Sequence, residues 1–209
     1  MVAARFIAFE GGEGSGKSTQ VERLATSLRA TGRTVTVTRE PGGSPRAEQI
    51  RSLILADGSA DLDARCEALL FAAARADHIT HTVRPALERG HIVLTDRYLD
   101  SSVAYQGVAR GLGADRIRDL SLWATDHTVP DLTVVLDIDP RVGLARAQDA
   151  NRLESEPLGF HDDVRQAFLD FAAAAPHRYT VISAVPPPDE VATLVRAAVD
   201  RCIMAGGLG

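Results

Sequence analysis

Residues 5–18 read RFIAFEGGEGSGKS, a short apolar run followed by glycines, one lysine and a serine. The stretch from Gly11 to Ser18 matches the pattern G-x-x-x-x-G-K-[ST], which predicts a loop whose backbone N–H groups surround a phosphate. The apolar run predicts a β-strand before the loop. The following KSTQVERLATSLRA predicts a helix whose N-terminus faces the anion. This order of strand, loop and helix is the context that the phosphate-binding motif requires.

The loop predicts where ATP and its metal ion bind. Lys17 is expected to reach the β- and γ-phosphates, and the Ser18 hydroxyl is expected to hold Mg²⁺. Lys17 is also the only lysine among the 23 basic residues, so an ammonium was kept where its compact shape matters. The predicted ATP-binding residues are Gly11, Gly12, Glu13, Gly14, Ser15, Gly16, Lys17, Ser18 and Thr19. The loop alone does not name the phosphate acceptor, and it would equally serve a GTPase switch or a motor ATPase.

The remaining pattern predicts a P-loop NTPase-type α/β fold of three layers. Five apolar, β-rich runs alternate with helical patterns, which is typical of a parallel sheet with helices on both faces. The predicted strands are Arg5–Phe9, Thr34–Thr38, His91–Thr95, Thr133–Asp137 and Tyr179–Ser183. The predicted helices begin near Lys17, Pro45, Asp61, Ala114, Pro140, His161 and Pro188. No composition shift marks a boundary, so residues 1–209 are expected to form a single kinase-like domain.

The composition of the chain indicates which classes of partner it does not bind. The net charge of −5 argues against a nucleic-acid partner, and no apolar run approaches the ~20 residues of a membrane helix. The N-terminus enters the first strand without the pattern of a signal peptide. Two cysteines and six histidines match no metal spacing. These features predict a cytoplasmic protein that acts on small molecules and uses only the Mg²⁺ that accompanies ATP.

Three further motifs predict an acceptor site beside the loop. They are TREPGG at 38–43, FAAAR at 71–75 and DRYLDSSVAYQG at 96–107. Two of them directly follow predicted strands, where ligands bind in parallel sheets. Asp96 ends an apolar strand and is a candidate ligand of the metal. The chemistry of the other side chains suggests phosphate binding by Arg39 and Arg97, base stacking on Phe71, and base-edge contacts from Arg75, Ser101, Ser102 and Gln106.

Together these motifs resemble bacterial thymidylate kinases, which transfer a phosphoryl group from ATP to dTMP. The resemblance extends from Phe6 to about Phe171. It implies that Glu13 contacts the sugar 3′-hydroxyl and that Tyr105 packs on the sugar and disfavours a 2′-hydroxyl. It also implies a cis bond before Pro41 in the floor of the base pocket, and a homodimer. A kinase for another pyrimidine nucleotide and a P-loop nucleotide-binding switch remain as alternative functions.

Phosphoryl transfer also needs cations on the migrating group. Lys17 and Arg97 are two candidates for this catalytic role. Some thymidylate kinases carry a further arginine inside the loop, where this chain has Gly14. The resemblance therefore points to a mobile lid at about 141–160, which supplies the cation from Arg152, with Arg146 as the second candidate.

Overall fold

The computed structural model describes residues 4–56, 62–146 and 153–205. Within them, one sheet contains five parallel strands, as predicted, and their order is β2-β3-β1-β4-β5. The strands are β1 (Arg5–Glu10), β2 (Val35–Arg39), β3 (Ile92–Asp96), β4 (Leu132–Asp137) and β5 (Tyr179–Ser183). Each predicted strand lies within one residue of these bounds. The apolar runs of β1, β3 and β4 are buried on both faces, whereas the edge strands β2 and β5 are partly exposed.

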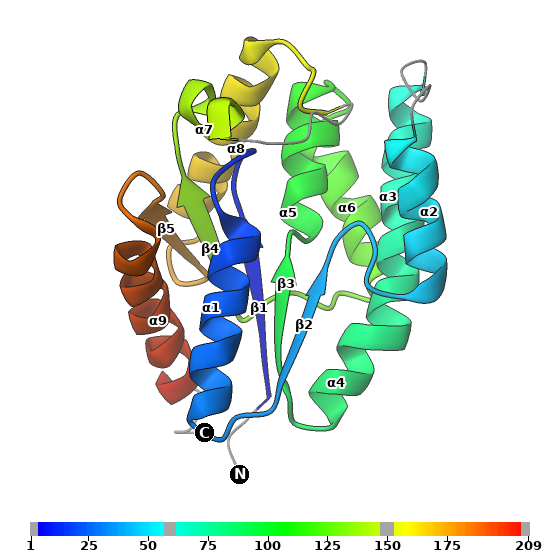
Figure 1. The fold of residues 1–209 in the computed structure, drawn as a ribbon. Helices are drawn as coiled ribbons and strands as arrows, with labels where there is room; N and C mark the ends of the chain where they lie inside the picture. The colour runs from blue at the N-terminus through cyan, green and yellow to red at the C-terminus, as the bar shows by residue number, and fades with distance from the viewer. Residues whose placement is uncertain (1–3, 57–61, 147–152, 206–209) are drawn as a thin grey trace.

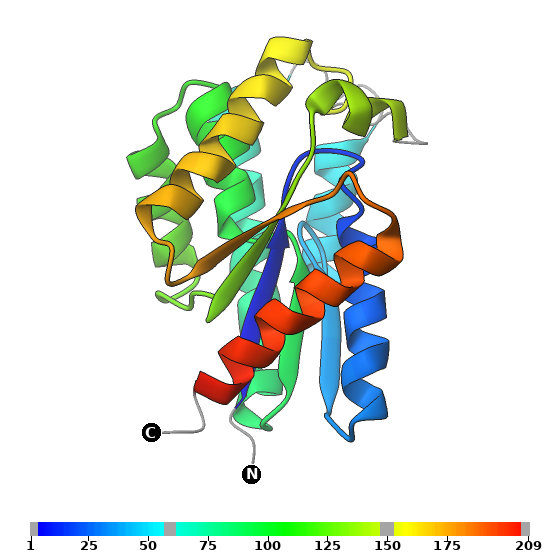
Figure 2. The same ribbon diagram turned by 90° about the vertical axis from the view of Figure 1, so that its left-hand side faces the viewer.

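Helices cover both faces of the sheet (Figures 1 and 2). On one face lie α1 (Lys17–Ala30) and α9 (Pro188–Ala205). The other face is covered by α3 (Ala64–His78), α5 (Leu99–Ser102), α6 (Ala114–Ala124) and α8 (Leu158–Ala174), with α2 (Pro45–Leu55) packed outside α3. The remaining helices are α4 (Arg84–Glu88) and α7 (Pro140–Arg146). This is the predicted three-layer arrangement.

Successive side chains of β1 point alternately to the two faces of the sheet. Ile7 and Phe9 belong to the core cluster that includes α1 and α9, whereas Phe6 and Ala8 belong to the cluster on the opposite face. This alternation follows from the two-residue period of a strand. With both faces covered, β1 is held rigidly, and the loop that follows it starts from a fixed position.

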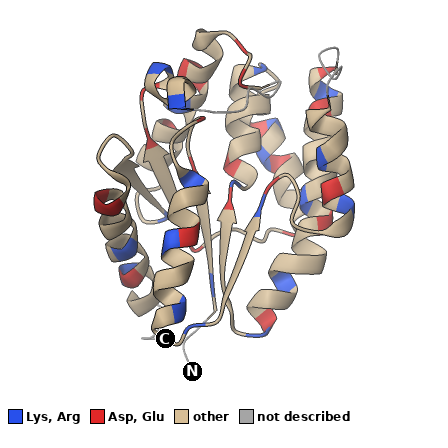
Figure 3. Cartoon of the chain, viewed as in Figure 1, with Lys and Arg blue, Asp and Glu red and all other residues tan. Residues whose placement is uncertain are grey.

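Each of the first four strands ends in a charged residue. Glu10, Arg39, Asp96 and Asp137 are the last residues of β1, β2, β3 and β4, and the strand segments before them are apolar or uncharged apart from Arg5 (Figure 3). Because the strands are parallel, these four charged ends meet at one edge of the sheet. Residues 11–16, the first six positions of the phosphate-loop motif, leave the sheet at the same edge.

The structure contains helical segments that the sequence pattern did not predict. Residues Leu99–Ser102 form α5, which continues into a π-helical segment, η3 (Val103–Ala109). A second π-helical segment, η2 (Ile79–Val83), joins α3 to α4. The helix predicted near Asp61 begins at Ala64, and the one predicted near His161 begins at Leu158. No helix among the described ranges is long and apolar enough to cross a membrane.

Candidate active site

The phosphate loop wraps around the side chain of Lys17. Lys17 is 7% exposed, and its Nζ donates hydrogen bonds to Gly11 O at 3.1 Å, Gly12 O at 2.8 Å and Ser15 Oγ at 3.3 Å. Burial, followed by repulsion from Arg97, lowers the pKa of the Lys17 ammonium to about 8, although nearby carboxylates oppose the shift. The ammonium is thus held at the loop by weak acceptors that phosphate oxygens can replace.

Ser18 and Asp96 come together at the edge of the sheet. Ser18 is the second residue of α1 and Asp96 is the last residue of β3, and the Ser18 hydroxyl donates to Asp96 Oδ2 at 2.5 Å. Both side chains line the cavity described below. Hydroxyl and carboxylate oxygens are ligands that Mg²⁺ accepts, so the pair fits the predicted metal position. The described residues contain no group of three or more His, Cys, Asp or Glu side chains that could hold a metal ion.

Arg97 and Glu13 form an ion pair above the loop. Arg97 NH2 donates to Glu13 Oε1 at 2.7 Å, and the Tyr105 hydroxyl donates to the same oxygen at 2.7 Å. Burial alone would raise the pKa of Glu13, but the Arg97 and Lys17 cations outweigh it and lower this pKa to about 2. The carboxylate therefore stays ionised, and it holds Arg97 in the absence of a bound phosphate.

A buried carboxylate fixes the backbone that carries Arg97. Arg97 has φ 67°, an unusual value for a residue with a side chain. Glu10 Oε1 accepts from the backbone N–H of Tyr98 at 2.9 Å and of Ser101 at 3.1 Å, and its Oε2 accepts from the Ser101 hydroxyl at 2.6 Å. Burial, assisted by Asp100, raises the pKa of Glu10 to about 8. These contacts tie the end of β1 to the start of α5.

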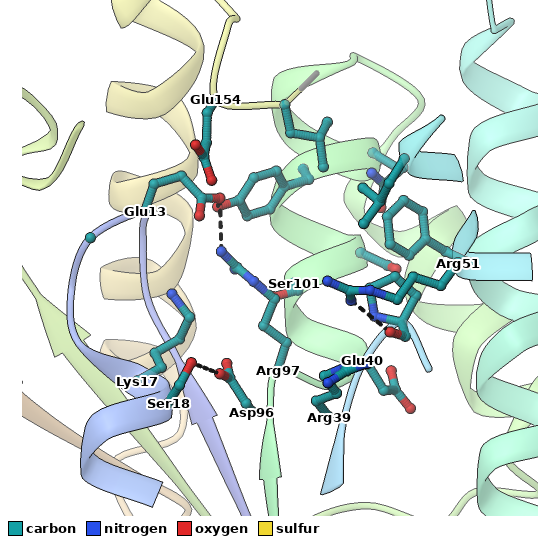
Figure 4. Close-up of a pocket in the computed structure, with 18 of the residues that line it drawn as sticks. Glu13, Lys17, Ser18, Arg39, Glu40, Arg51, Asp96, Arg97, Ser101 and Glu154 are labelled. Atoms are coloured by element: carbon teal, nitrogen blue, oxygen red, sulfur yellow. Dashed lines mark hydrogen bonds and ion pairs between the residues drawn. The ribbon is translucent and has the colours of Figure 1, made fainter. Parts of the chain in front are cut away.

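The segment after β2 forms the opposite wall. The Glu40–Pro41 peptide bond is cis, as the family resemblance predicts. Arg39 pairs with Glu48 at 3.0 Å, and Arg51 NH1 donates to Pro41 O at 2.8 Å. Figure 4 shows Lys17, Ser18 and Asp96 on one side of the cavity, Arg39 and Arg51 on the other, and Arg97 between them. The arginines thus face the phosphate-loop side across the cavity.

These elements surround a cavity of about 520 Å³. Its volume is sufficient to hold a part of each of two nucleotides. Most of the predicted acceptor-site residues line it, and so do both predicted metal ligands. The predicted residues in the lining are Glu13, Gly14, Gly16, Lys17, Ser18, Thr19, Arg39, Pro41, Phe71, Asp96, Arg97, Ser101, Ser102, Tyr105 and Gln106. Residues from motifs that are far apart in the sequence therefore share one site.

Some predicted residues do not reach the cavity. Gly11, Gly12 and Ser15 are absent from its lining, and Arg75 lies behind it, 2% exposed. Arg146 is exposed, and its NH1 donates to Ala184 O at 2.9 Å. Arg152, the preferred lid cation, is outside the described residues, as is the middle of the predicted lid.

Arg75 is held by protein groups on several sides. Its Nε donates to Glu40 Oε2 at 2.7 Å, and its NH1 donates to Ser121 Oγ at 3.1 Å. Its NH2 donates to Ser102 Oγ at 2.9 Å, and Ser102 does line the cavity. Glu40 is also within 2.9 Å of His78 Nδ1. In this structure Arg75 acts on the cavity through Ser102 and Glu40.

Comparison with known proteins assigns the family. A family model described as thymidylate kinase matches residues 9–195. The chain is 52% identical over 202 residues to a thymidylate kinase from Bifidobacterium longum subsp. infantis, covering 95% of this chain and 87% of the relative. It is 50% identical over 205 residues to one from Clavibacter michiganensis subsp. michiganensis, covering 96% and 97% of the two chains. The chain belongs to the thymidylate kinase family.

A solved structure agrees with this assignment. The crystal structure of thymidylate kinase from Ehrlichia chaffeensis superposes with a TM-score of 0.80 at 32% identity, covering 94% of this chain and 99% of that one. This chain thus shares its overall fold with that structure. The resemblance inferred from the motifs is confirmed.

Sequence reasoning missed five residues that line the cavity of this thymidylate kinase family member. They are Glu40, Arg51, Leu55, Leu153 and Glu154. Glu40 lies within the quoted TREPGG motif and could have been noted. Arg51 and Leu55 are four residues apart on α2, and this spacing places them on one face without showing what that face meets. Leu153 and Glu154 follow the undescribed part of the predicted lid.

Proposed function

We propose that the chain transfers the γ-phosphoryl group of ATP to dTMP, giving dTDP and ADP. The observation that carries the proposal is the division of one cavity. The phosphate loop, Ser18 and Asp96 lie on one side, and three arginines with Phe71 and Gln106 supply the rest. Such a cavity suits two nucleotides whose phosphates meet near Arg97. Transfer between phosphates requires alignment and charge neutralisation rather than a general base.

Each side of the cavity has its own task in this proposal. Lys17 neutralises the β- and γ-phosphates, and Ser18 and Asp96 would hold Mg²⁺, which supplies further positive charge on the ATP phosphates when bound. Arg39, Arg51 and Arg97 bind the acceptor phosphate. Arg97 exchanges Glu13 for that phosphate, which releases the Glu13 carboxylate to accept from the sugar 3′-hydroxyl. The contacts at 2.7 Å from Arg97 and Tyr105 to Glu13 support this exchange.

The base is proposed to lie between Phe71 and the polar residues of α5 and η3. Phe71 is buried on α3 yet faces the cavity, so it offers an apolar face for stacking. Ser102 and Gln106 supply hydrogen bonds to the base edge, and Tyr105 packs on the sugar where a 2′-hydroxyl would lie. A deoxyribonucleotide with a pyrimidine base fits these requirements.

We also propose a homodimer in the cytoplasm. The exposed apolar side chains Leu53, Leu69 and Trp123 lie on α2, α3 and α6, and α3 contacts both other helices on one face of the sheet. An exposed apolar face of this kind is typical of a protein interface. The thiols of Cys66 and Cys202 are free, which suits a reducing compartment.

A coupled assay of ADP release tests the activity. With ATP and Mg²⁺ held constant, we expect turnover that depends on dTMP and is lower with dUMP, UMP and dCMP. Lys17→Arg is the matched inactive control, because a guanidinium does not fit among Gly11 O, Gly12 O and Ser15 Oγ. ADP release that does not depend on any monophosphate would instead identify a nucleotide-binding switch. Preference for another monophosphate would identify a kinase with a different acceptor.

A further inference from the structure

Glu67 is a buried carboxylate next to the proposed base pocket with no task in the mechanism above. It is 0% exposed and lies one helical turn before Phe71 on α3, so the two side chains share a face of that helix. Its Oε1 accepts a hydrogen bond from Gln106 Nε2 at 2.7 Å. Its Oε2 lies 3.6 Å from NH2 of Arg110. Glu67 therefore stands between a residue of the cavity wall and a cation outside it.

This contact decides how the Gln106 amide is oriented. The NH₂ group of Gln106 is the donor in this hydrogen bond, so it faces the acceptor oxygen of Glu67. The carbonyl oxygen of Gln106 then points away from Glu67, and the structure gives it no hydrogen-bond partner among the described residues. Since Gln106 lines the cavity, this oxygen is available as an acceptor for a base.

An acceptor at this position distinguishes pyrimidines. Thymine and uracil carry a proton on N3 and can donate to the Gln106 oxygen. Cytosine has an unprotonated N3, which would leave two acceptors facing each other. A site built to hydrogen-bond one partner strongly rejects an analogue that cannot form the bond. A freely rotating glutamine would lose this discrimination, because its NH₂ group would serve cytosine equally well.

We propose that Glu67 is a positioning residue that sets the pyrimidine specificity of the site by fixing the Gln106 amide with its oxygen toward the base. The inference rests on the proposed function, since it takes the base to lie beside Phe71. Arg110 contributes by facing the other oxygen of Glu67 at 3.6 Å, and it is itself held by Glu156 through a hydrogen bond of 2.6 Å. The orientation is thus fixed from outside the cavity, by groups that need not touch the nucleotide.

The test replaces Glu67 with glutamine, which can donate or accept and so no longer dictates the orientation of Gln106. We expect the ratio of kcat/KM for dTMP to that for dCMP to fall at least ~10-fold in Glu67→Gln, with the KM for ATP unchanged. The matched control is Glu190→Gln, which neutralises an exposed carboxylate on α9, on the opposite face of the sheet, and it should keep the wild-type ratio. If Glu67 had a purely structural role, the substitution would lower kcat/KM for dTMP and for dCMP equally and leave their ratio unchanged.

A second variant keeps the test decisive if Glu67→Gln fails to fold. Gln106→Met preserves length and removes the amide, and it should lower the same ratio at least ~10-fold. A ratio within twofold of the wild type in Gln106→Met, or in folded Glu67→Gln, would overturn the inference. Failure of the proposed function is separate, because it would appear as absence of dTMP-dependent turnover in the wild-type chain.

Discussion

At the scale of single residues, the ammonium of Lys17 couples ATP binding to pH. Burial and Arg97 lower its pKa to about 8 in the free chain. Bound phosphates add negative charge, so they must raise this pKa, and the free chain must take up a proton when ATP binds at higher pH. Above pH 8 the Lys17 amine is mostly deprotonated in the free chain, whereas it is protonated in the complex with ATP. The affinity for ATP should therefore fall as the pH rises above 8.

Calorimetry in buffers of different ionisation enthalpy measures this proton directly. We expect uptake of about one proton per ATP at pH 9 and much less at pH 7. Lys17→Met is the control, because it removes the titrating group and should abolish the difference between the two pH values. Equal uptake in Lys17→Met and the wild type would assign the proton to another group.

Arg75 is expected to matter for stability as well as for substrate. It is paired at 2.7 Å with Glu40, and both side chains are at most 3% exposed. Arg75→Met would remove the arginine from the buried Glu40 carboxylate, at a cost of ~3–5 kcal/mol in the free energy of unfolding. Urea unfolding measures this loss. Arg65→Met removes an 81% exposed arginine from the same helix and should change stability by no more than ~0.5 kcal/mol.

The contrast between Lys17 and Arg75 shows how far the residues of the site could be predicted. Lys17, Ser18 and Asp96 were predicted because a local motif and a strand end fix their surroundings. The spacing of Phe71 and Arg75 correctly placed both on one face of a helix. It could not show that Glu40, from a distant loop, occupies the space in front of Arg75. Contacts between segments far apart in the sequence carry no local signal.

At the scale of elements, the phosphate loop and α7 are packed backbone to backbone. A Cβ added at Gly14 would lie 1.9 Å from Gly143 O, and one added at Gly143 would lie 2.3 Å from Glu13 O. Gly14 also has φ 63°, which disfavours other residues. A loop arginine at position 14 is therefore incompatible with α7 in this position. The glycine follows from the packing of the segment that leads into the predicted lid.

Gly143→Ala tests this contact. The added methyl group must push α7 away from the loop, so we expect a loss of ~1–3 kcal/mol in stability and a higher KM for ATP. Thermal unfolding and steady-state kinetics provide the two measurements. Gly159→Ala is the matched control in the first turn of α8, where an added Cβ meets nothing within 4 Å. Similar behaviour of the two variants would mean that the close approach has no effect on ATP use.

The lid arginines remain a prediction that kinetics must decide. Arg146 binds a backbone carbonyl on the surface, and Arg152 is outside the described residues. We expect Arg152→Ala to lower turnover at least ~10-fold, a barrier change of about 1.4 kcal/mol, and Arg146→Ala to have a smaller effect. Both variants should retain the wild-type melting temperature. If neither lowers turnover tenfold, the additional cation comes from Arg39 or Arg97.

Element prediction failed where two helical segments follow a motif without a break. No helix was predicted over residues 99–109, where Ser101, Ser102 and Gln106 were noted only as candidate ligand contacts. The structure places them on α5 and η3, whose first turn is anchored by Glu10. The central strands β1, β3 and β4 were predicted to within a residue because burial on both faces leaves a continuous apolar run. A short helix capped by a side chain from another element leaves no comparable pattern.

At the scale of the whole molecule, the proposed dimer face can be tested with the protein's single tryptophan. Trp123 on α6 is 79% exposed and Leu69 on the neighbouring α3 is 58% exposed, so both should become buried if two copies pair through this face. Leu69→Lys would place a charge in an apolar contact and should shift the protein to a monomer in sedimentation velocity.

The same variant should show the red-shifted fluorescence of a solvated indole, whereas the wild type should lose its blue shift only on dilution. Leu194→Lys is the control, because Leu194 is 51% exposed on α9, on the opposite face of the sheet. Both variants exchange a half-exposed leucine for lysine, so a general effect of charge would alter them equally. A dimer that survives Leu69→Lys with Trp123 still solvated would place the interface elsewhere on the molecule.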